Sequence, residues 1–234
     1  MNAQWFTGFA TLFLAFVALF KDTVLMWILK PKIDIELDLR PPDCFKSQVV
    51  ILQQKLILQQ REIERIEFYL FYYRLRIINK GKSPAKYVEV AIRVIKKKKG
   101  NSFERMDFVL DDNLDLASSK LIAGRKSLMY YKFISPGTFK HCELGHILDP
   151  SKRNLDPSEN NKLFRQDKTI FAFNVMTRYH SLYHIIEPGT YRFKIFVAGE
   201  NFDALAKEYE MEITGKWSEN EDKMLNEGLR IKEM

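Results

Sequence analysis

The sequence is poor in cysteine and lacks any glycine-rich or proline-rich repeat. Two cysteines among 234 residues cannot form a disulfide framework. The ten glycines and eight prolines exclude a collagen-like chain, and 46% hydrophobic with 29% charged residues excludes global disorder and a wholly intramembrane bundle. A chain of this length can form one domain of ordinary size, or two small ones, with a buried core.

The motifs that mark common catalytic and nucleotide-binding sites are also missing. The sequence contains no Walker phosphate-binding loop, no dinucleotide-binding fingerprint, no Gly-x-Ser-x-Gly elbow, no Cys-x-x-Cys and no His-Glu-x-x-His. Its net charge of +7 is spread along the chain, whereas a nucleic-acid-binding surface needs exposed aromatic residues among the basic ones. We therefore expect a protein that is not an enzyme, holds no cofactor or metal and binds no nucleic acid.

The first thirty residues contain a long hydrophobic run. Residues 5–20 carry no charge, and after a charged pair at 21–22 the apolar character resumes up to Lys30. Sixteen uncharged residues fall short of the ~20 that cross a bilayer core, but counting on to residue 29 gives sufficient length. Lys21 then extends its charged end to the interface, and Trp27 lies in the interfacial belt. The sequence predicts a transmembrane helix over residues 1–31, in contact with membrane lipid, with interface residues Trp5, Lys21, Trp27 and Lys30.

Two alternatives to a membrane anchor are a cleaved signal peptide and a buried core helix. A signal peptide needs a positive beginning and a small-x-small cleavage site, but the first four residues carry no Lys or Arg, and two bulky residues separate Ala15 from Ala18. A core helix of a soluble domain needs a polar face, which this run lacks. Lysines and arginines follow the span and none precedes it, so a single-pass protein of the cell membrane with a cytoplasmic body is expected.

The rest of the chain shows the two-residue hydrophobic period of half-buried strands. Residues 128–134 and 169–176 are apolar on both faces, which predicts central strands. Short strands with turn signals between them predict an all-β fold, an Ig-like β-sandwich over residues 32–215. The predicted inward-facing residues are Ile33, Ile35, Leu37 and Leu39; Tyr69, Phe71, Tyr73, Leu75 and Ile77; Val88, Val90, Ile92 and Val94; Met106, Phe108 and Leu110; Tyr191, Phe193, Ile195 and Val197; and Tyr209, Met211 and Ile213.

Three segments depart from this pattern. Residues 46–67 fit either a short helix or an insertion hairpin, and the sequence leaves the choice open. Residues 149–167 are polar and contain two prolines, which predicts a long exposed loop. In the tail, residues 216–234, a capping-box pattern at 218–221 predicts a short C-terminal helix, with Trp217 packed back on the sandwich.

One hairpin pattern resembles a known family. It reads Asn79-x-Gly81-x-Ser83-Pro84-Ala85-x-x-Val88-x-Val90. This resembles the hairpin of Ig-like prokaryotic β-sandwich modules of the CARDB (cell-adhesion-related domain in bacteria) type. The whole chain also resembles a group of uncharacterised prokaryotic single-pass membrane proteins, through the Pro-Pro-Asp-Cys turn at 41–44 and the Gly-Lys-Trp-Ser tail at 215–218. Neither resemblance implies an activity, and adhesion-type modules are usually exported, whereas the charge bias here places the body inside.

Several residues are of types that bind metal ions, contact lipid or react as thiols in other proteins. A zinc site would draw on His141, Cys142, His146, His180 and His184, but exposed loop histidines are the favoured interpretation. The acidic run at 111–115 begins like a calcium loop, yet Leu116 and Ile122 replace its glycine and its bidentate glutamate. Residues 96–99 (KKKK) indicate a solvated hairpin tip that could contact anionic lipid. Cys44 is interpreted as a small buried residue.

Two functions from different classes follow. The first is a membrane-anchored, non-enzymatic interaction or scaffold module that faces the cytoplasm and binds a protein partner. The alternative is an exported, membrane-tethered sandwich that binds carbohydrate or envelope components through residues 149–167 and the region of Tyr179 and Tyr183. A hydrolase site built from His141, His180 and His184 is a third reading, which requires these side chains to converge.

Overall fold

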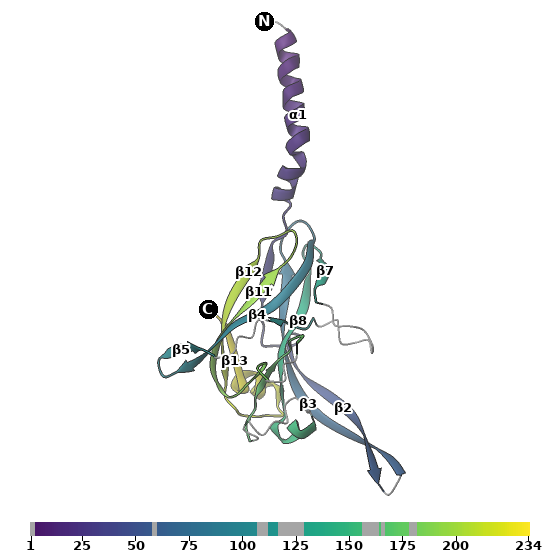
Figure 1. The fold of residues 1–234 in the computed structure, drawn as a ribbon, viewed down its shortest axis with the longest axis vertical. Coiled ribbons are helices and arrows are strands. Elements are labelled where there is room, and N and C mark those ends of the chain that lie inside the picture. Colours follow the sequence, from purple (N-terminus) through teal and green to yellow (C-terminus); the bar gives the residue numbers. More distant parts are fainter. Residues whose placement is uncertain are drawn as a thin grey trace.

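A computed structural model shows one long helix that projects from a body of β-strands (Figure 1). The structure describes the backbone of residues 3–57, 60–106, 112–116, 129–155, 164, 167–177 and 182–234. Side chains are described for the same residues except 3–7, 19, 22–28, 51–57, 60–64, 154 and 155. The predicted inward residues Phe108 and Leu110 therefore lie outside the described residues, as do Tyr179 and His180.

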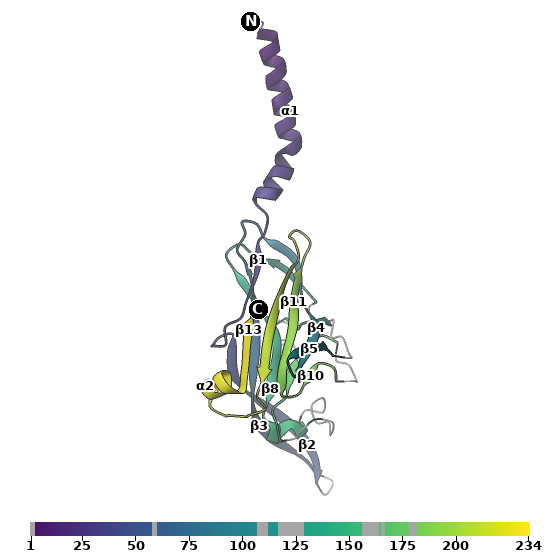
Figure 2. The same cartoon turned by 90° about the vertical axis from the view of Figure 1, so that its left-hand side faces the viewer.

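The hydrophobic run forms helix α1 (Ala3–Ile28), which extends away from the body with the N-terminus at its far end (Figures 1 and 2). Every side chain described between residues 8 and 18 is exposed. The predicted transmembrane span is not found: over the part of the chain with described residues, no helix has the length and apolar character to cross a membrane.

Two antiparallel sheets form the body, so the chain has the expected all-β fold with few helices. The first sheet contains β1 (Ile33–Glu36), β2 (Cys44–Ile57), β3 (Gln60–Asn79), β8 (Phe139–Leu148), β9 (Phe171–Phe173) and β10 (Ile185–Ile186), in the order β1-β3-β8-β9-β10 with β2 also paired to β3. The second contains β4 (Ala85–Lys99), β5 (Ser102–Arg105), β6 (Asp112–Asn113), β7 (Tyr131–Ile134), β11 (Gly189–Ala198), β12 (Leu205–Ile213) and β13 (Leu229–Glu233), in the order β13-β12-β11-β4-β5 with β6 and β7 also paired to β4.

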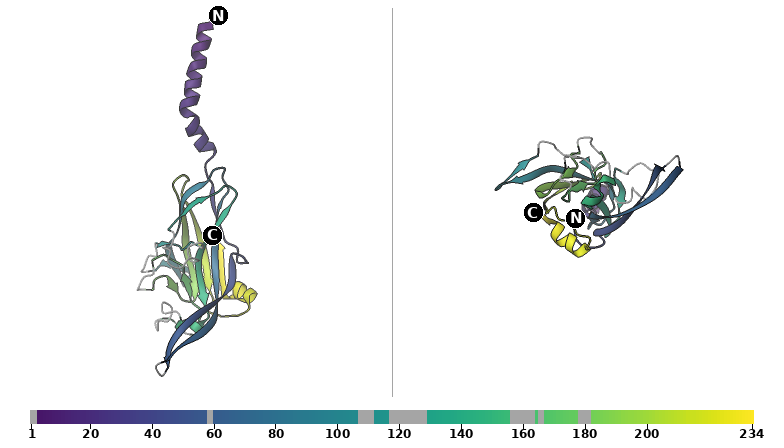
Figure 3. Two further views of the ribbon diagram at one scale, coloured as in Figure 1. Left: turned by 90° about the vertical axis from the view of Figure 1, so that its right-hand side faces the viewer. Right: turned by 90° about the horizontal axis from the view of Figure 1, so that it is seen from below.

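One hydrophobic core lies between the two sheets, as expected for a sandwich. The first sheet contributes inward side chains such as Phe71 and Leu75, and the second contributes Ile92, Ile195 and Met211, all in one cluster. The alternation predicted the buried residues of β11 and β12 correctly. In β1 it predicted the buried Ile35, while Ile33 is half-buried against the core. In β3 the prediction failed at Tyr69, which is exposed, because the β2–β3 hairpin extends beyond the second sheet and has no facing layer there (Figures 1 and 3).

The prediction also failed at Val94 in β4, which is half-buried while its neighbour Ile95 is fully buried. The register of β4 with β11 shifts between Arg192 and Lys194, and Val94 has a positive φ of 53°. An extra residue of this kind reverses the facing of every later side chain. The bulge therefore moves Ile95 into the core in place of Val94.

The structure resolves the segments that the sequence left open. Residues 46–57 and 60–67 belong to strands β2 and β3, which pair continuously from Cys44 with Tyr73 to Ile57 with Gln60, so the hairpin alternative is confirmed. Of the predicted loop at 149–167, the described part contains a 3-10 helix, η1 (Pro150–Leu155), and residues 156–163, 165 and 166 lie outside the description.

The tail contains the expected helical segment, formed by α2 (Glu221–Lys223) and the π-helical η2 (Met224–Gly228). Asn220 is its N-cap, since its side chain accepts a hydrogen bond from the Lys223 backbone N–H. Trp217 packs on the core and contacts Phe71 edge-on, as predicted. The sequence analysis did not foresee β13, which follows the helix and pairs with β12.

Candidate functional site

A group of ion pairs and hydrogen bonds fixes the junction where the chain leaves α1 and enters β1. Lys30 is half-buried, and its Nζ lies 2.6 Å from Asp203 Oδ2 in the loop between β11 and β12. Pro31 is buried, and since proline lacks an N–H the helix cannot continue through it. The chain therefore enters the body at a fixed point, between loops of both sheets.

Asn79 holds this point from inside the body. Its side chain is fully buried, and its Nδ2 donates to the carbonyl oxygens of Ser83, at 2.7 Å, and Ile134, at 2.9 Å. Its Oδ1 accepts from the backbone N–H groups of Gly81, at 2.9 Å, and Lys32, at 3.3 Å. A single amide thus joins the β3–β4 turn, strand β7 and the chain that emerges from α1.

Gly81 is required by the close approach of two backbones at the same place. A Cβ on this residue would lie 2.3 Å from the Lys32 nitrogen and 2.6 Å from the Pro31 Cα. Backbone atoms cannot move aside as a flexible side chain can, so a side chain at position 81 forces the chain exit apart. The Asn79-x-Gly81 pattern resembles a hairpin signature in the sequence. In the structure these two residues contact and position the chain that leaves α1.

Charged groups support the first strand of the body. Lys80 Nζ lies 2.7 Å from Asp34 Oδ2 and 2.8 Å from Glu36 Oε1, while Lys207 Nζ lies 2.9 Å from Asp34 Oδ1. Partial burial by itself raises the pKa of Asp34, but the hydrogen bonds from Lys80 and Lys207 outweigh this and lower it to about 2. The same bonds to Asp34 and Glu36 raise the pKa of Lys80 above its ordinary value.

The four interface residues predicted from the sequence are distributed along α1 and its exit. Lys30 takes part in the junction, and Lys21 is exposed. The side chains of Trp5 and Trp27 lie outside the described residues.

The predicted loop histidines lie mostly on a strand that the sequence analysis missed. His141, Cys142 and His146 all belong to β8, whose alternation is broken by a register shift opposite Tyr73 and Arg74. Cys142 faces the core, whereas His141 Nε2 lies 3.0 Å from the buried Asp43 Oδ1, which also accepts from Arg76 Nε at 2.8 Å.

These histidines do not assemble a metal site within the described structure. His146 Nδ1 lies 2.8 Å from Asn174 Oδ1, and the buried His184, which precedes β10, lines the same small pocket as His146 and Asn174. Among the described residues no group of three or more His, Cys, Asp or Glu is placed to hold a metal ion. Cys44 is fully buried, as predicted, and this burial raises the pKa of its thiol to about 12.

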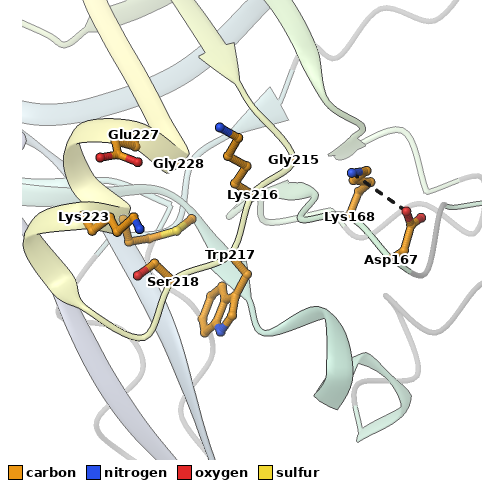
Figure 4. Close-up of a pocket in the computed structure, with 10 residues that line it drawn as sticks. Asp167, Lys168, Gly215, Lys216, Trp217, Ser218, Lys223, Glu227 and Gly228 are labelled. Carbon is orange, nitrogen blue, oxygen red and sulfur yellow. Dashed lines mark ion pairs between the residues drawn. The ribbon is translucent and has the colours of Figure 1, made fainter.

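A cavity of about 360 Å³ lies between the C-terminal helical segment, residues 215–218 that lead into it, and residues 167–168 (Figure 4). Three lysines and two acidic residues line it, from three parts of the chain: Lys168, Lys216, Lys223, Asp167 and Glu227. The opposite charges partly cancel, since Lys168 Nζ lies 3.9 Å from Asp167 Oδ2. Sequence patterns carry no signal for this cavity, because its wall comes from segments far apart in the chain.

No family model matches this chain, and no curated protein is significantly similar to it. Its function therefore has to be inferred from the geometry of the helix, the junction and the sandwich.

Proposed function

We propose that this protein is a membrane-anchored, non-enzymatic interaction module, in which α1 enters lipid and an Ig-like, CARDB-type sandwich faces the cytoplasm and binds a protein partner. One observation carries the proposal. Seven large apolar side chains of α1 have exposed fractions from 42% to 76%: Phe9, Leu12, Phe13, Leu14, Phe16, Val17 and Phe20.

Lipid is the environment that suits such a helix. Exposing this much apolar surface to water is unfavourable, since moving one large apolar side chain out of water contributes roughly 1.5–3 kcal/mol. Contiguous apolar patches of this kind mark membrane or protein contacts in general. Here the exposed side chains follow one another along residues 8–18 without a polar face, so the helix needs an apolar surrounding on every side and not a groove on one side.

The junction supports a role for the body close to the membrane. Asn79, Gly81 and the Lys30–Asp203 pair fix the exit of the chain against both sheets. An anchor joined in this way presents the sandwich in a defined orientation, which a long flexible linker does not do.

The non-enzymatic part of the proposal is supported by the structural use of reactive groups. His141 pairs with Asp43, His146 pairs with Asn174, and burial makes the Cys44 thiol hard to ionise. These residues stabilise strands of the first sheet and are not directed into the cavity of Figure 4.

Extraction of membranes at alkaline pH tests the anchor. The full chain should stay in the membrane pellet after a carbonate wash, as should the matched variant F13L/V17L. The variant F13K/V17K should move to the supernatant, because each lysine carried into the hydrocarbon of a bilayer on a helix costs about 2.5–3.5 kcal/mol of insertion. Release of the unaltered chain by the wash would contradict the proposal.

A reporter fused after Met234 tests the orientation. Alkaline phosphatase should be inactive and a fluorescent protein bright if the C-terminus is cytoplasmic. The opposite result would overturn the cytoplasmic placement and favour the exported, ligand-binding alternative.

A further inference from the structure

The end of the body nearest α1 has the composition of a lipid-binding surface. We propose that this end lies on anionic phospholipid headgroups of the bilayer that holds α1, an inference that rests on the proposed function. The α1-proximal end is defined here as the β3–β4 turn at 79–84, the β7–β8 turn at 135–138 and the β11–β12 loop at 199–204, together with the strand residues next to them.

These three connections meet around the chain exit. The Asn79 backbone N–H donates to Thr138 O at 3.0 Å, which joins the two turns. Asn201 donates to Pro84 O and accepts from the Lys86 N–H, each at 2.9 Å, which joins the loop to the start of β4. Because Lys30 also pairs with Asp203, the three connections surround the base of α1 (Figure 1). Any surface that α1 enters must therefore face them.

Lysines without an ionic partner gather at this end. Lys82, Lys86, Lys132 and Lys140 lie in or within three residues of the turns and are exposed. None of the four forms an ion pair with a residue that the structure describes, whereas Asp203, Asp34 and Glu36 are already paired with Lys30 and Lys80. Glu89 and Glu200 are exposed and oppose the lysines, but four lysines against two glutamates leave the balance positive. Such an excess of ammonium groups complements the phosphates of an anionic leaflet.

Exposed aromatic side chains lie among these lysines. Tyr87, Tyr130 and Phe133 have exposed fractions of 43%, 40% and 55%. The Tyr87 and Tyr130 rings contact each other edge-on with centroids 5.4 Å apart, and Phe133 is the cross-strand neighbour of Lys86. Amphipathic rings beside lysines are typical of protein surfaces at the headgroup level of a bilayer.

The backbone at Tyr87 has an unusual conformation. Tyr87 has φ of 50°, which is rare for a bulky residue and costs of order 1–3 kcal/mol. The strain is held in place next to Lys86, whose N–H and carbonyl group are bonded to Asn201 and Glu200. In this conformation the exposed Tyr87 ring contacts the Tyr130 ring.

The expected effect is reversible docking of the body on its own membrane. Each lysine near an anionic surface shifts the docked-to-free ratio about fivefold, so three together shift it roughly a hundredfold. Docking should therefore occur on anionic bilayers, weaken with salt and fail on neutral bilayers that still hold α1.

A fluorophore at the α1-proximal end tests this in the full chain. Pro136 is exposed in the β7–β8 turn, so P136C can carry an environment-sensitive label, while the buried Cys44 and Cys142 do not react in the folded protein. The labelled chain is reconstituted into vesicles of phosphatidylcholine alone or with a third of phosphatidylglycerol. We expect a blue-shifted emission in the anionic vesicles, its reversal by added salt, and its loss in K82E/K86E/K132E.

The control variant K98E/K152E/K223E makes the same change of net charge at exposed positions away from the α1-proximal end. It should keep the blue shift. Equal emission in neutral and anionic vesicles, or an unchanged shift in K82E/K86E/K132E, would overturn the inference. Flotation of the same samples separates the two proposals, because a chain that floats with neutral vesicles retains its anchor, and a chain that floats with none contradicts the anchor itself.

Discussion

Helix α1 and the β-sandwich are built from the same apolar residue types, but they place them in opposite ways. Phe13 in α1 has an exposed fraction of 67%, whereas Phe193 in β11 has one of 1%. The sandwich alternates apolar and polar residues and so supplies its own core, while α1 is apolar on every side and supplies none. The body can therefore fold against itself, whereas the exposed apolar side chains of α1 have no apolar surrounding in the rest of the described chain.

The greatest loss of stability is expected when a phenylalanine of the sandwich core is truncated, and the same change in α1 serves as the comparison. Phe193 packs against Phe173 and Tyr209, with ring centroids 5.7 and 5.8 Å away. Phe193→Ala should lower the free energy of unfolding of the body by about 3–5 kcal/mol, because it leaves a cavity in a close-packed core. Urea unfolding of the full chain in detergent, followed by the fluorescence of Trp217, measures the loss.

Phe13→Ala is the matched control and should change that free energy by less than ~0.5 kcal/mol. A loss of similar size from both substitutions would mean that α1 packs against the body, and the comparison would then fail.

Hydrophobic alternation predicted most of the sandwich because local period alone decides which side chains face inward. It identified β11 and β12, where Tyr191 to Val197 and Tyr209 to Ile213 are buried in alternation. It failed at β8, where the register shift breaks the period, and at Val94, where a bulge reverses it. Bulges depend on the neighbouring strand and leave no clear signal in one sequence.

The candidate site was predictable in its residues but not in its role. Asn79 and Gly81 stood out as turn residues, yet the partner that gives them their function, Lys32, lies 47 positions earlier in the chain. The cavity beside the C-terminal helix could not be predicted either, because it combines Lys168 with Lys216 and Lys223, which are far away in the chain. Sequence patterns indicate which residues are close along the chain. Both sites consist of residues that are far apart in the sequence and come together only in the fold.

A smaller effect is expected where the two regions join. Asn79→Ala removes four hydrogen bonds and leaves buried donors and acceptors without partners, so the body should lose about 2–3 kcal/mol of unfolding free energy. Asn201→Ala removes two bonds that water can replace and should cost less than ~1 kcal/mol. Both variants should still resist carbonate extraction, since neither alters α1. An Asn79 variant as stable as the Asn201 variant would show that the junction does not support the fold.

The smallest effect concerns the ion pairs of β1, the first strand of the body after α1. Asp34 has an ordinary pKa of 3.8 and a folded pKa of about 2, so its contribution to stability is complete above about pH 4 and is lost as the pH falls toward 2. Because the group is partly exposed, solvent screening reduces this contribution to roughly 1 kcal/mol. Asp34→Asn should therefore lose less stability than the unaltered chain between pH 4 and pH 2 in acid titrations of urea unfolding. Asp38→Asn, which breaks an exposed pair with Arg40, should follow the unaltered chain. Parallel acid profiles for Asp34→Asn and the unaltered chain would show that the ion pairs of Asp34 add nothing to stability, and that the pairing of β1 with β3 and the burial of Ile35 hold the strand.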